Sequence, residues 1–292
     1  MTETGDRRRL VNRLGERFRR NGAAVVSRLR GKRTALPPDA RNRSLRIGLV
    51  IAALTVLSIL VAAIFLDGPS VLWVRSRSAS VNHVFQAITG LGKSNWILIP
   101  TAILVLLLLF GDWQRVDRAT RLAWSTIGAL AFYLFAAVAG SGIAVNIIKP
   151  FVGRVRPLVF EAVDPFNFHP FRPGYDHASF PSAHATTMGA LIVAGCLIFP
   201  RWRPAIIAAG FVIAASRVMV RAHYPSDVVG GLALGGLFAY GMARFLAGIG
   251  YGFSHRPHAT IRARTEVVRR AFARRGGPRR MLAGLVKALE AR

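Results

Sequence analysis

The chain has little cysteine and few acidic residues. Its 292 residues include one cysteine, Cys196, and 13 Asp and Glu against 40 Lys and Arg. A single cysteine excludes a small scaffold held together by disulfides. The apolar content of 52% excludes a disordered chain, because such chains have too few apolar residues to form a core.

Long apolar runs dominate the sequence. Residues 47–66 contain no charged side chain, and this run is long enough to cross a hydrocarbon core of about 30 Å. A soluble domain is therefore excluded. Six candidate spanning segments follow one another at about 47–66, 95–111, 122–148, 183–200, 204–221 and 227–246. We expect an all-α fold, a polytopic membrane helical bundle of about six transmembrane helices.

Positive charge gathers at both ends of the chain. Residues 1–46 hold 14 Lys and Arg against 4 Asp and Glu, and residues 244–292 hold 12 against 2. Lys and Arg near spanning segments favour the cytoplasmic side, and an even number of segments places both ends on one side. We expect basic cytoplasmic tails at 1–46 and 247–292, attracted to anionic lipid, around a membrane domain at 47–246. Without a recognition module we expect no nucleic-acid partner.

Each tail has apolar residues at helical spacing among its arginines, as at Leu10, Leu14 and Phe18. This spacing is typical of an amphipathic helix on a membrane surface, although a solvated tail also fits the composition. The sequence Gly276-Gly277-Pro278 is expected to interrupt the C-terminal tail.

Three short polar clusters lie near the ends of the last four spanning segments. They are Lys149 with Arg156-Pro157, Pro181-Ser182-Ala183-His184, and Ser216-Arg217 with His223 and Asp227. Their positive side chains lie on the face where the charge bias of the loops disfavours them. Ionisable groups at membrane depth usually pair with one another or mark a functional site. The sequence therefore places the candidate site within 149–227.

Gathered in one pocket, these side chains could carry out phosphoryl transfer. Lys149, Arg156 and Arg217 would neutralise a multiply charged oxyanion. Ser182 begins a helix, whose free N–H groups favour an anion. One histidine can attack phosphorus while the other protonates the leaving oxygen, and Asp227 can orient the attacking imidazole. No cluster of Asp and Glu accompanies them, so we expect neither a metal nor another cofactor.

The clusters resemble the signature of the type 2 phosphatidic acid phosphatase superfamily, which also contains vanadium haloperoxidases and glucose-6-phosphatase. In that pattern a Lys lies seven residues before Arg-Pro, then comes Pro-Ser-Gly-His, and then Ser-Arg, five residues, His, three residues and Asp. All three parts occur here in order, with Ala183 in place of the usual Gly. The resemblance covers about 149–227, and the hydropathy pattern extends it to 47–246.

The resemblance implies a role for each matched residue. His223 would be the nucleophile that forms a phosphohistidine, and Asp227 would orient it. His184 would protonate the leaving group and then activate water. The groups that would hold the phosphoryl oxygens are Lys149, Arg156, Ser182, the backbone N–H of Ala183, and Arg217.

Two further arginines, Arg154 and Arg221, flank the matched positions. They could contact a lipid headgroup or a second phosphate. They could equally pair with Asp164, Asp176 or Glu161.

The sequence therefore predicts a membrane-embedded, metal-independent lipid phosphatase. It would hydrolyse a phosphate monoester or diphosphate of an anionic lipid, such as undecaprenyl diphosphate, phosphatidic acid, phosphatidylglycerol phosphate or lipid A. The Arg- and Ala-rich composition suits a bacterial inner membrane, with the site facing the periplasm and with the bilayer and the lipid substrate as partners. A lipid phosphotransferase would use the same site and is an alternative. A non-catalytic lipid-binding protein is disfavoured, because it would have lost His223 or Asp227.

Overall fold

The computed structural model describes residues 3–31, 38–77, 79–159, 164–255, 260–274 and 276–290. The chain divides into two compact units. The larger unit holds residues 36–98 and 136–242, and the smaller unit holds residues 1–35, 99–135 and 243–292. The division falls inside three long helices, α5 (Asn95–Phe110), α6 (Arg118–Val152) and α9 (Pro225–Gly248). The predicted boundaries at 46 and 246 stay predictions.

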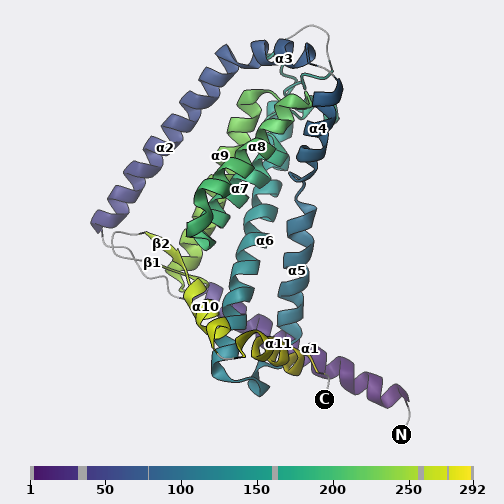
Figure 1. Ribbon diagram of the computed structural model, residues 1–292, viewed down its shortest axis with the longest axis vertical. Helices are drawn as coiled ribbons and strands as arrows, with labels where there is room; N and C mark the ends of the chain where they lie inside the picture. The colour runs from purple at the N-terminus through teal and green to yellow at the C-terminus, as the bar shows by residue number, and fades with distance from the viewer. Residues whose placement is uncertain are drawn as a thin grey trace. The chain divides into compact units, whose positions relative to one another are not determined.

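The larger unit also contains α2 (Pro38–Phe65), α3 (Asp67–Arg75), α4 (Ala79–Gly90), α7 (Ala183–Ile198) and α8 (Arg203–Met219), with short 3-10 turns at Tyr175–His177 and Pro200–Trp202. Helices α7, α8 and α9 lie side by side (Figure 1). Glycine permits the close approach of α7 to α9, because a Cβ on Gly189 would lie 2.1 Å from the carbonyl oxygen of Leu232. A Cβ on Gly235 would lie 1.9 Å from the carbonyl oxygen of Thr186. The backbones of α7 and α9 are therefore in contact, as small residues allow in membrane bundles.

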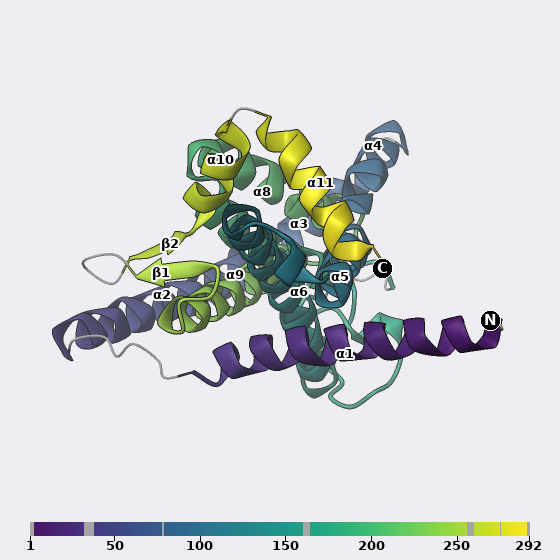
Figure 2. The same ribbon diagram turned by 90° about the horizontal axis from the view of Figure 1, so that it is seen from below.

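The smaller unit contains α1 (Glu3–Leu29), a 3-10 turn at Trp113–Arg115, the strands β1 (Phe253–His255) and β2 (Ile261–Ala263), and the helices α10 (Thr265–Ala273) and α11 (Gly277–Leu289). The strands pair antiparallel, with Phe253 opposite Ala263. The ring of Phe253 packs edge-on against Tyr133, with centroids 4.7 Å apart. Helices α10 and α11 meet at an angle (Figure 2), which confirms the predicted interruption at Gly276-Gly277-Pro278. The described part of the C-terminal tail is folded.

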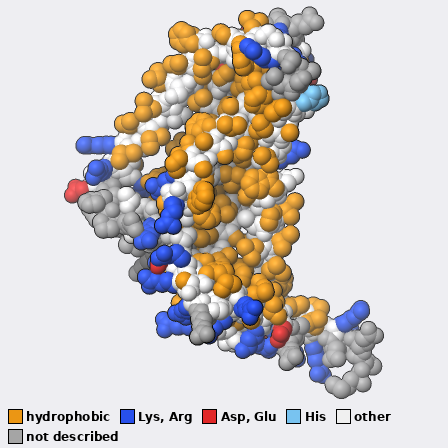
Figure 3. Space-filling view, in the orientation of Figure 1, with side chains coloured by type: hydrophobic (Ala, Val, Ile, Leu, Met, Phe, Trp, Pro, Cys, Tyr) orange, Lys and Arg blue, Asp and Glu red, His pale blue; other side chains and the backbone are white. Residues whose placement is uncertain are grey.

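Five helical segments are long and apolar enough to cross a membrane, namely Arg41–Phe65, His83–Phe110, Arg118–Val152, Pro200–Met219 and Pro225–Gly248. Helix α7, with 16 residues, rises about 24 Å and is the shorter sixth candidate, so the count of six stays a prediction. The expected segment 95–111 is longer in the structure because α4 leads into α5. Apolar side chains cover the face of the helices drawn in Figure 3. Along α2 they include the exposed Leu49, Leu57 and Ile64, as expected for a helix in contact with lipid.

Candidate active site

The structure brings the three predicted polar clusters together at one end of the larger unit. Lys149 lies near the C-terminal end of α6, and its Nζ donates a hydrogen bond to the carbonyl oxygen of Ala178. Ser182 is the N-cap of α7, and its backbone N–H donates to the carbonyl oxygen of Asp227 over 3.1 Å. His223 lies in the turn between α8 and α9. Residues from three separate segments therefore form one site.

His223 is buried, with 2% of its surface exposed. Its Nδ1 lies 3.5 Å from Oδ2 of Asp227, and its Nε2 lies 3.3 Å from Nη1 of Arg156. Burial lowers the pKa of the His223 imidazole to about 3, and the charges of Arg156 and Lys149 act in the same direction. The imidazole is therefore neutral at ordinary pH. With a proton on Nδ1 facing Asp227, Nε2 carries a lone pair that can attack an electrophile.

Arg156 lies beside Nε2 of His223, and several contacts hold its guanidinium in place. Its Nε donates to the carbonyl oxygen of Tyr175 over 2.8 Å, and its Nη2 donates to that of Ala178 over 3.1 Å. Cζ of the guanidinium also lies 3.7 Å from the centroid of the Tyr175 ring. These contacts hold the guanidinium in place without neutralising it.

Arg217 and His184 lie close enough to Arg156 for their charges to interact. Nη1 of Arg217 donates to Oγ1 of Thr89 over 2.9 Å, and within the described residues its buried Nε has no hydrogen-bond partner. The charges of Arg217 and Lys93 are close enough to act on the His184 imidazole. Gly92 leaves room for that ring, because a Cβ there would lie 2.9 Å from Cδ2 of His184. We call Lys149, Arg156 and Arg217 the cation group.

Ala183 is the first residue of α7, where the family pattern has Gly. The non-glycine residues with positive φ in the described chain are Phe171 and Arg221, so Ala183 has an ordinary backbone conformation. Oγ of Ser182 accepts the N–H of Ala185 over 3.5 Å. The N–H of Ala183 belongs to the first helical turn, whose donors favour an anion. The departure from Gly therefore strains nothing and keeps the donor.

Arg154 has different partners from Arg156, although the two arginines are two residues apart. Its backbone forms an isolated antiparallel bridge with Phe168. Nη1 of Arg154 lies 2.6 Å from Oδ1 of Asp227, and Nη2 lies 2.7 Å from Oδ2 of Asp67. Nη1 also donates to Oγ of Ser226.

The two remaining donations of Arg154, one from Nε and one from Nη2, go to the carbonyl oxygen of Pro165 over 3.0 and 2.7 Å. All five N–H donors of the guanidinium therefore have protein acceptors. The headgroup contact predicted for Arg154 stays a prediction. In the described residues no ion pair joins Arg154 to Asp164 or Asp176, and Glu161 lies outside those residues. We call Asp67, Arg154, Ser226 and Asp227 the rear network.

Asp67 and Ser226 are the members of the rear network that the sequence did not predict. Asp67 is fully buried, and besides Arg154 it accepts the backbone N–H of Ser226 over 3.0 Å and the Ser226 hydroxyl over 2.6 Å. Asp227 in turn accepts the Ser179 hydroxyl over 2.5 Å and the N–H of Tyr224 over 2.9 Å. Asp67 directly follows the first apolar run and has no motif spacing. Its position at the end of a spanning segment, in a chain with a surplus of arginines, was the one feature of the sequence that could have indicated a buried ion pair.

Arg221 occupies the turn before His223 with a φ of 55°. In the described part of the chain no ion pair joins it to Asp164 or Asp176. Its side chain is half-buried. The headgroup contact predicted for Arg221 stays a prediction.

Comparisons with known proteins match the region that holds the site. A family model described as the PAP2 superfamily matches residues 130–250. A lipid A 1-phosphatase of Rhizobium johnstonii is 38% identical over 207 residues, which is 70% of this chain and 82% of that protein. A lipid A 1-phosphatase of Rhizobium etli is 37% identical and covers 64% of this chain and 79% of its own. The undecaprenyl-diphosphatase BcrC of Bacillus subtilis is 28% identical and covers 56% and 82%.

Proposed function

The chain belongs to the PAP2 superfamily and is a membrane lipid phosphatase, and we propose that it transfers the phosphoryl group of its lipid substrate to His223 and then to water. One observation carries this proposal. His223 is held between Asp227, 3.5 Å from Nδ1, and Arg156, 3.3 Å from Nε2. A neutral imidazole with a carboxylate on one nitrogen and a phosphate-binding guanidinium beside the other is suited to nucleophilic attack.

In the first step the lone pair on Nε2 of His223 attacks phosphorus. The bond from phosphorus to the lipid oxygen breaks, and His184 gives its proton to that oxygen. The imidazole becomes cationic, and the Asp227 carboxylate stabilises the new charge at Nδ1. The cation group and the N–H of Ala183 hold the phosphoryl oxygens while negative charge is redistributed among them.

In the second step water replaces the histidine. His184 takes a proton from the water, whose oxygen attacks phosphorus, and the bond between phosphorus and Nε2 breaks. Inorganic phosphate leaves and His223 returns to its neutral form. Because His184 must first give and then take a proton, and His223 must be neutral, activity is expected to fall on both sides of a pH optimum.

The substrate that we propose first is lipid A phosphorylated at position 1. Two relatives at 37% and 38% identity are lipid A 1-phosphatases, and each covers more than three-fifths of this chain. Undecaprenyl diphosphate is the second candidate, because the relative at 28% identity is an undecaprenyl-diphosphatase. In either case the phosphate is the part that the cation group binds.

We further propose an inner-membrane location with cytoplasmic tails and a periplasmic site. The surplus of 14 Lys and Arg over 4 Asp and Glu in residues 1–46 supports this orientation. In a Cys196→Ser background, the variant Arg172→Cys should react with a membrane-impermeant maleimide in cells with a permeabilised outer membrane. The variant Arg279→Cys should react only after lysis. The reverse pattern would overturn the orientation.

The reaction itself is tested by phosphate release from a panel of lipids in excess EDTA. The panel contains lipid A with its 1-phosphate, undecaprenyl diphosphate and phosphatidic acid. We expect release by the wild-type protein and by His83→Ala, a variant of an exposed histidine in α4. We expect no release by His223→Ala.

A trapping experiment identifies the intermediate. Brief incubation with a radiolabelled substrate should leave an acid-labile, base-stable label on the wild-type protein and on His83→Ala, but not on His223→Ala. Turnover that survives in His223→Ala would show that another group is the nucleophile. Turnover that EDTA abolishes would show that a metal is required.

A further inference from the structure

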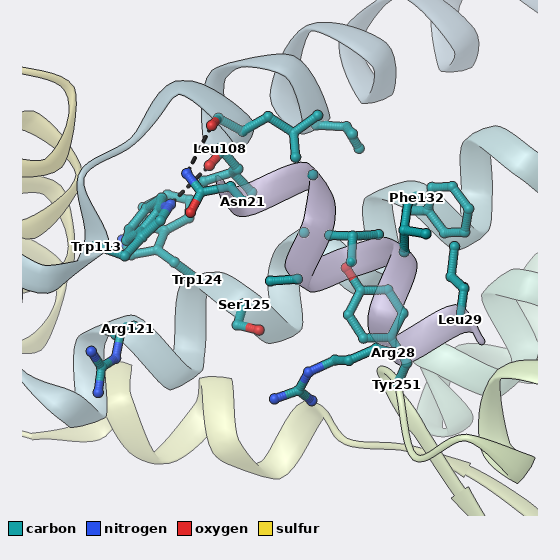
Figure 4. Close-up of a pocket in the computed structure, with 17 residues that line it drawn as sticks. Asn21, Arg28, Leu29, Leu108, Trp113, Arg121, Trp124, Ser125, Phe132 and Tyr251 are labelled. Carbon is teal, nitrogen blue, oxygen red and sulfur yellow. Dashed lines mark hydrogen bonds between the residues drawn. The ribbon is translucent and has the colours of Figure 1, made fainter. Parts of the chain in front are cut away.

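The smaller unit contains a cavity of about 520 Å³ between α1 and the parts of α5 and α6 that belong to the same unit (Figure 4). Residues within 21–29 of α1 form one wall, and Tyr251 and Trp113 complete the lining. None of the lining residues belongs to the active site. The volume lies within the range of about 300–1,000 Å³ that is typical of small-molecule sites.

The wall formed by α1 is attached to the rest of the unit by specific contacts. Nδ2 of Asn21 donates to the carbonyl oxygens of Leu109 and Gly111, both over 2.8 Å. The rings of Phe18 and Phe110 lie 5.2 Å apart. These contacts join α1 to the C-terminal end of α5, so the cavity has a fixed wall.

The interior of the cavity is apolar. Side chains such as Val25, Val105 and Phe132 line it. The indole N–H groups in the lining already have acceptors, because Trp113 donates to Leu108 over 2.8 Å and Trp124 donates to Met281 over 3.0 Å, in both cases to the carbonyl oxygen. A cavity of this kind offers few partners to water and suits a hydrocarbon chain.

The rim of the cavity is positively charged. Arg28 and Arg121 both line it, and Figure 4 shows their guanidinium groups along its lower side. Both side chains are exposed. In the described part of the chain neither guanidinium has a carboxylate partner. Unpaired guanidinium groups at the edge of an apolar cavity favour a phosphate that is attached to an apolar chain.

The sequence of α1 changes character where it reaches the cavity. Residues 3–20 carry most of its arginines, whereas residues 22–26 read Gly-Ala-Ala-Val-Val. We propose that the cavity binds an anionic phospholipid of the bilayer, with an acyl chain between α1, α5 and α6 and the headgroup phosphate at Arg28 and Arg121. Free phosphate is a poorer ligand, because it makes no contact with the apolar walls. A zwitterionic lipid is also a poorer ligand, because the positive charge of its headgroup would lie near the arginines.

Two glycines of α1 provide a matched test. A Cβ at Gly22 or at Gly15 would have no heavy atom within 4 Å, but only Gly22 lines the cavity. Gly22→Leu therefore fills part of the cavity, and Gly15→Leu makes the same chemical change elsewhere on α1. Both changes favour the helix, because glycine is a poor helix former.

The measurement is native mass spectrometry of the detergent-purified full chain with phosphatidylglycerol. This lipid carries a phosphodiester, so it is not a substrate of the monoester and diphosphate chemistry proposed above. We expect Gly22→Leu to lower the amount bound by at least about 10-fold, because the leucine displaces buried methylene groups. Gly15→Leu should bind as the wild type does. Thermal unfolding of both variants checks that they are folded.

The headgroup is tested with phosphatidylcholine that carries the same acyl chains. We expect the wild type to prefer phosphatidylglycerol, and we expect Arg28→Gln with Arg121→Gln to lower that preference by about 10-fold. Equal binding of the two lipids by the wild type would overturn the anionic selectivity. Binding by folded Gly22→Leu at the wild-type level would overturn the site, and so would displacement of the lipid by millimolar inorganic phosphate.

Discussion

Two groups of buried charge lie on opposite sides of His223, and they use arginine in opposite ways. In the rear network, Arg154 lies between the Asp67 and Asp227 carboxylates and uses all of its donors on protein acceptors. In the cation group, Lys149, Arg156 and Arg217 contact carbonyl oxygens, a hydroxyl and an aromatic ring. The described part of the chain supplies the cation group with no ion pair.

This difference in pairing indicates that the two groups have different roles, the cation group in binding the substrate and the rear network in positioning Asp227. A buried charge without a partner is unfavourable, and it favours the arrival of an opposite charge. On the proposed function, we therefore expect the cation group to attract a phosphate. The rear network has two carboxylates around one guanidinium, so its cation already has protein partners, and it fixes the direction in which Asp227 faces His223.

The largest effect is expected from Arg154→Met. This change leaves the carboxylates of Asp67 and Asp227 buried without their shared cation, and removing one partner of a buried ion pair lowers the free energy of unfolding by about 3–5 kcal/mol. We expect a large fall in the thermal unfolding temperature in detergent, together with loss of activity.

The double variant Arg154→Met with Asp67→Asn separates charge from packing. It removes one of the two carboxylates that Arg154→Met leaves without a cation, so part of the lost free energy of unfolding should be recovered. A single variant Arg154→Met that unfolds at the wild-type temperature would contradict the role given to the rear network.

Arg156→Gln tests the role given to the cation group. Removing one preorganised charge on the transferring group lowers kcat/KM by about 100- to 1,000-fold. No carboxylate is left unpaired, so we expect the loss of stability to stay below about 2 kcal/mol. Equal losses of stability in Arg156→Gln and Arg154→Met would remove the distinction between the two sides.

The same variant changes the pH dependence in a defined direction. Burial and the charge of Arg156 hold the pKa of His223 at about 3, so in the wild type protonation of this residue lowers kcat/KM only as the pH approaches 3. Without the Arg156 charge the pKa rises, and the acid-side loss moves to higher pH. A pH profile whose acid limb moves to lower pH, or does not move, would contradict this account.

The sequence singled out all three residues of the cation group, but only two of the four residues of the rear network. Lys149, Arg156 and Arg217 belong to short clusters with family spacing, so their chemistry could be interpreted locally. Arg154 lies two residues from Arg156 with the same side chain, and only its contacts with Asp67 and Asp227, which belong to other segments, distinguish the two arginines.

In the fold, too, the features that could be predicted are those with a local sequence pattern. The uncharged run at 47–66 predicted the apolar helix α2, because its length and composition are sufficient evidence for a spanning helix. The two strands have three residues each, which is too short for an alternating pattern to indicate a strand. The partnership of Asp67 with Arg154 spans 87 positions, and no local spacing could reveal it.

Asp67→Asn is expected to have a moderate effect. The amide keeps the shape and an acceptor for Ser226, but it weakens a charge-assisted bond to Arg154, and the orientation of Asp227 becomes less fixed. We expect kcat to fall by about 10-fold with little change in KM. Asp164→Asn, at an exposed carboxylate near the same site, is the matched control. A change in KM alone would show that Asp67 acts on binding.

The smallest effect is expected from Ala183→Gly, which restores the residue usual in the family. Ala183 does not have a positive φ, so glycine relieves no strain and kcat/KM should change by less than about 3-fold. Ala183→Pro is its counterpart, because proline suits the first helical position but removes the N–H. Ser182, with φ −70° and ψ 118°, already has the conformation that a following proline requires. A loss of at least about 10-fold in Ala183→Pro alone would establish that this N–H binds the phosphoryl group, whereas a large gain in Ala183→Gly would mean that the Ala183 methyl group crowds it.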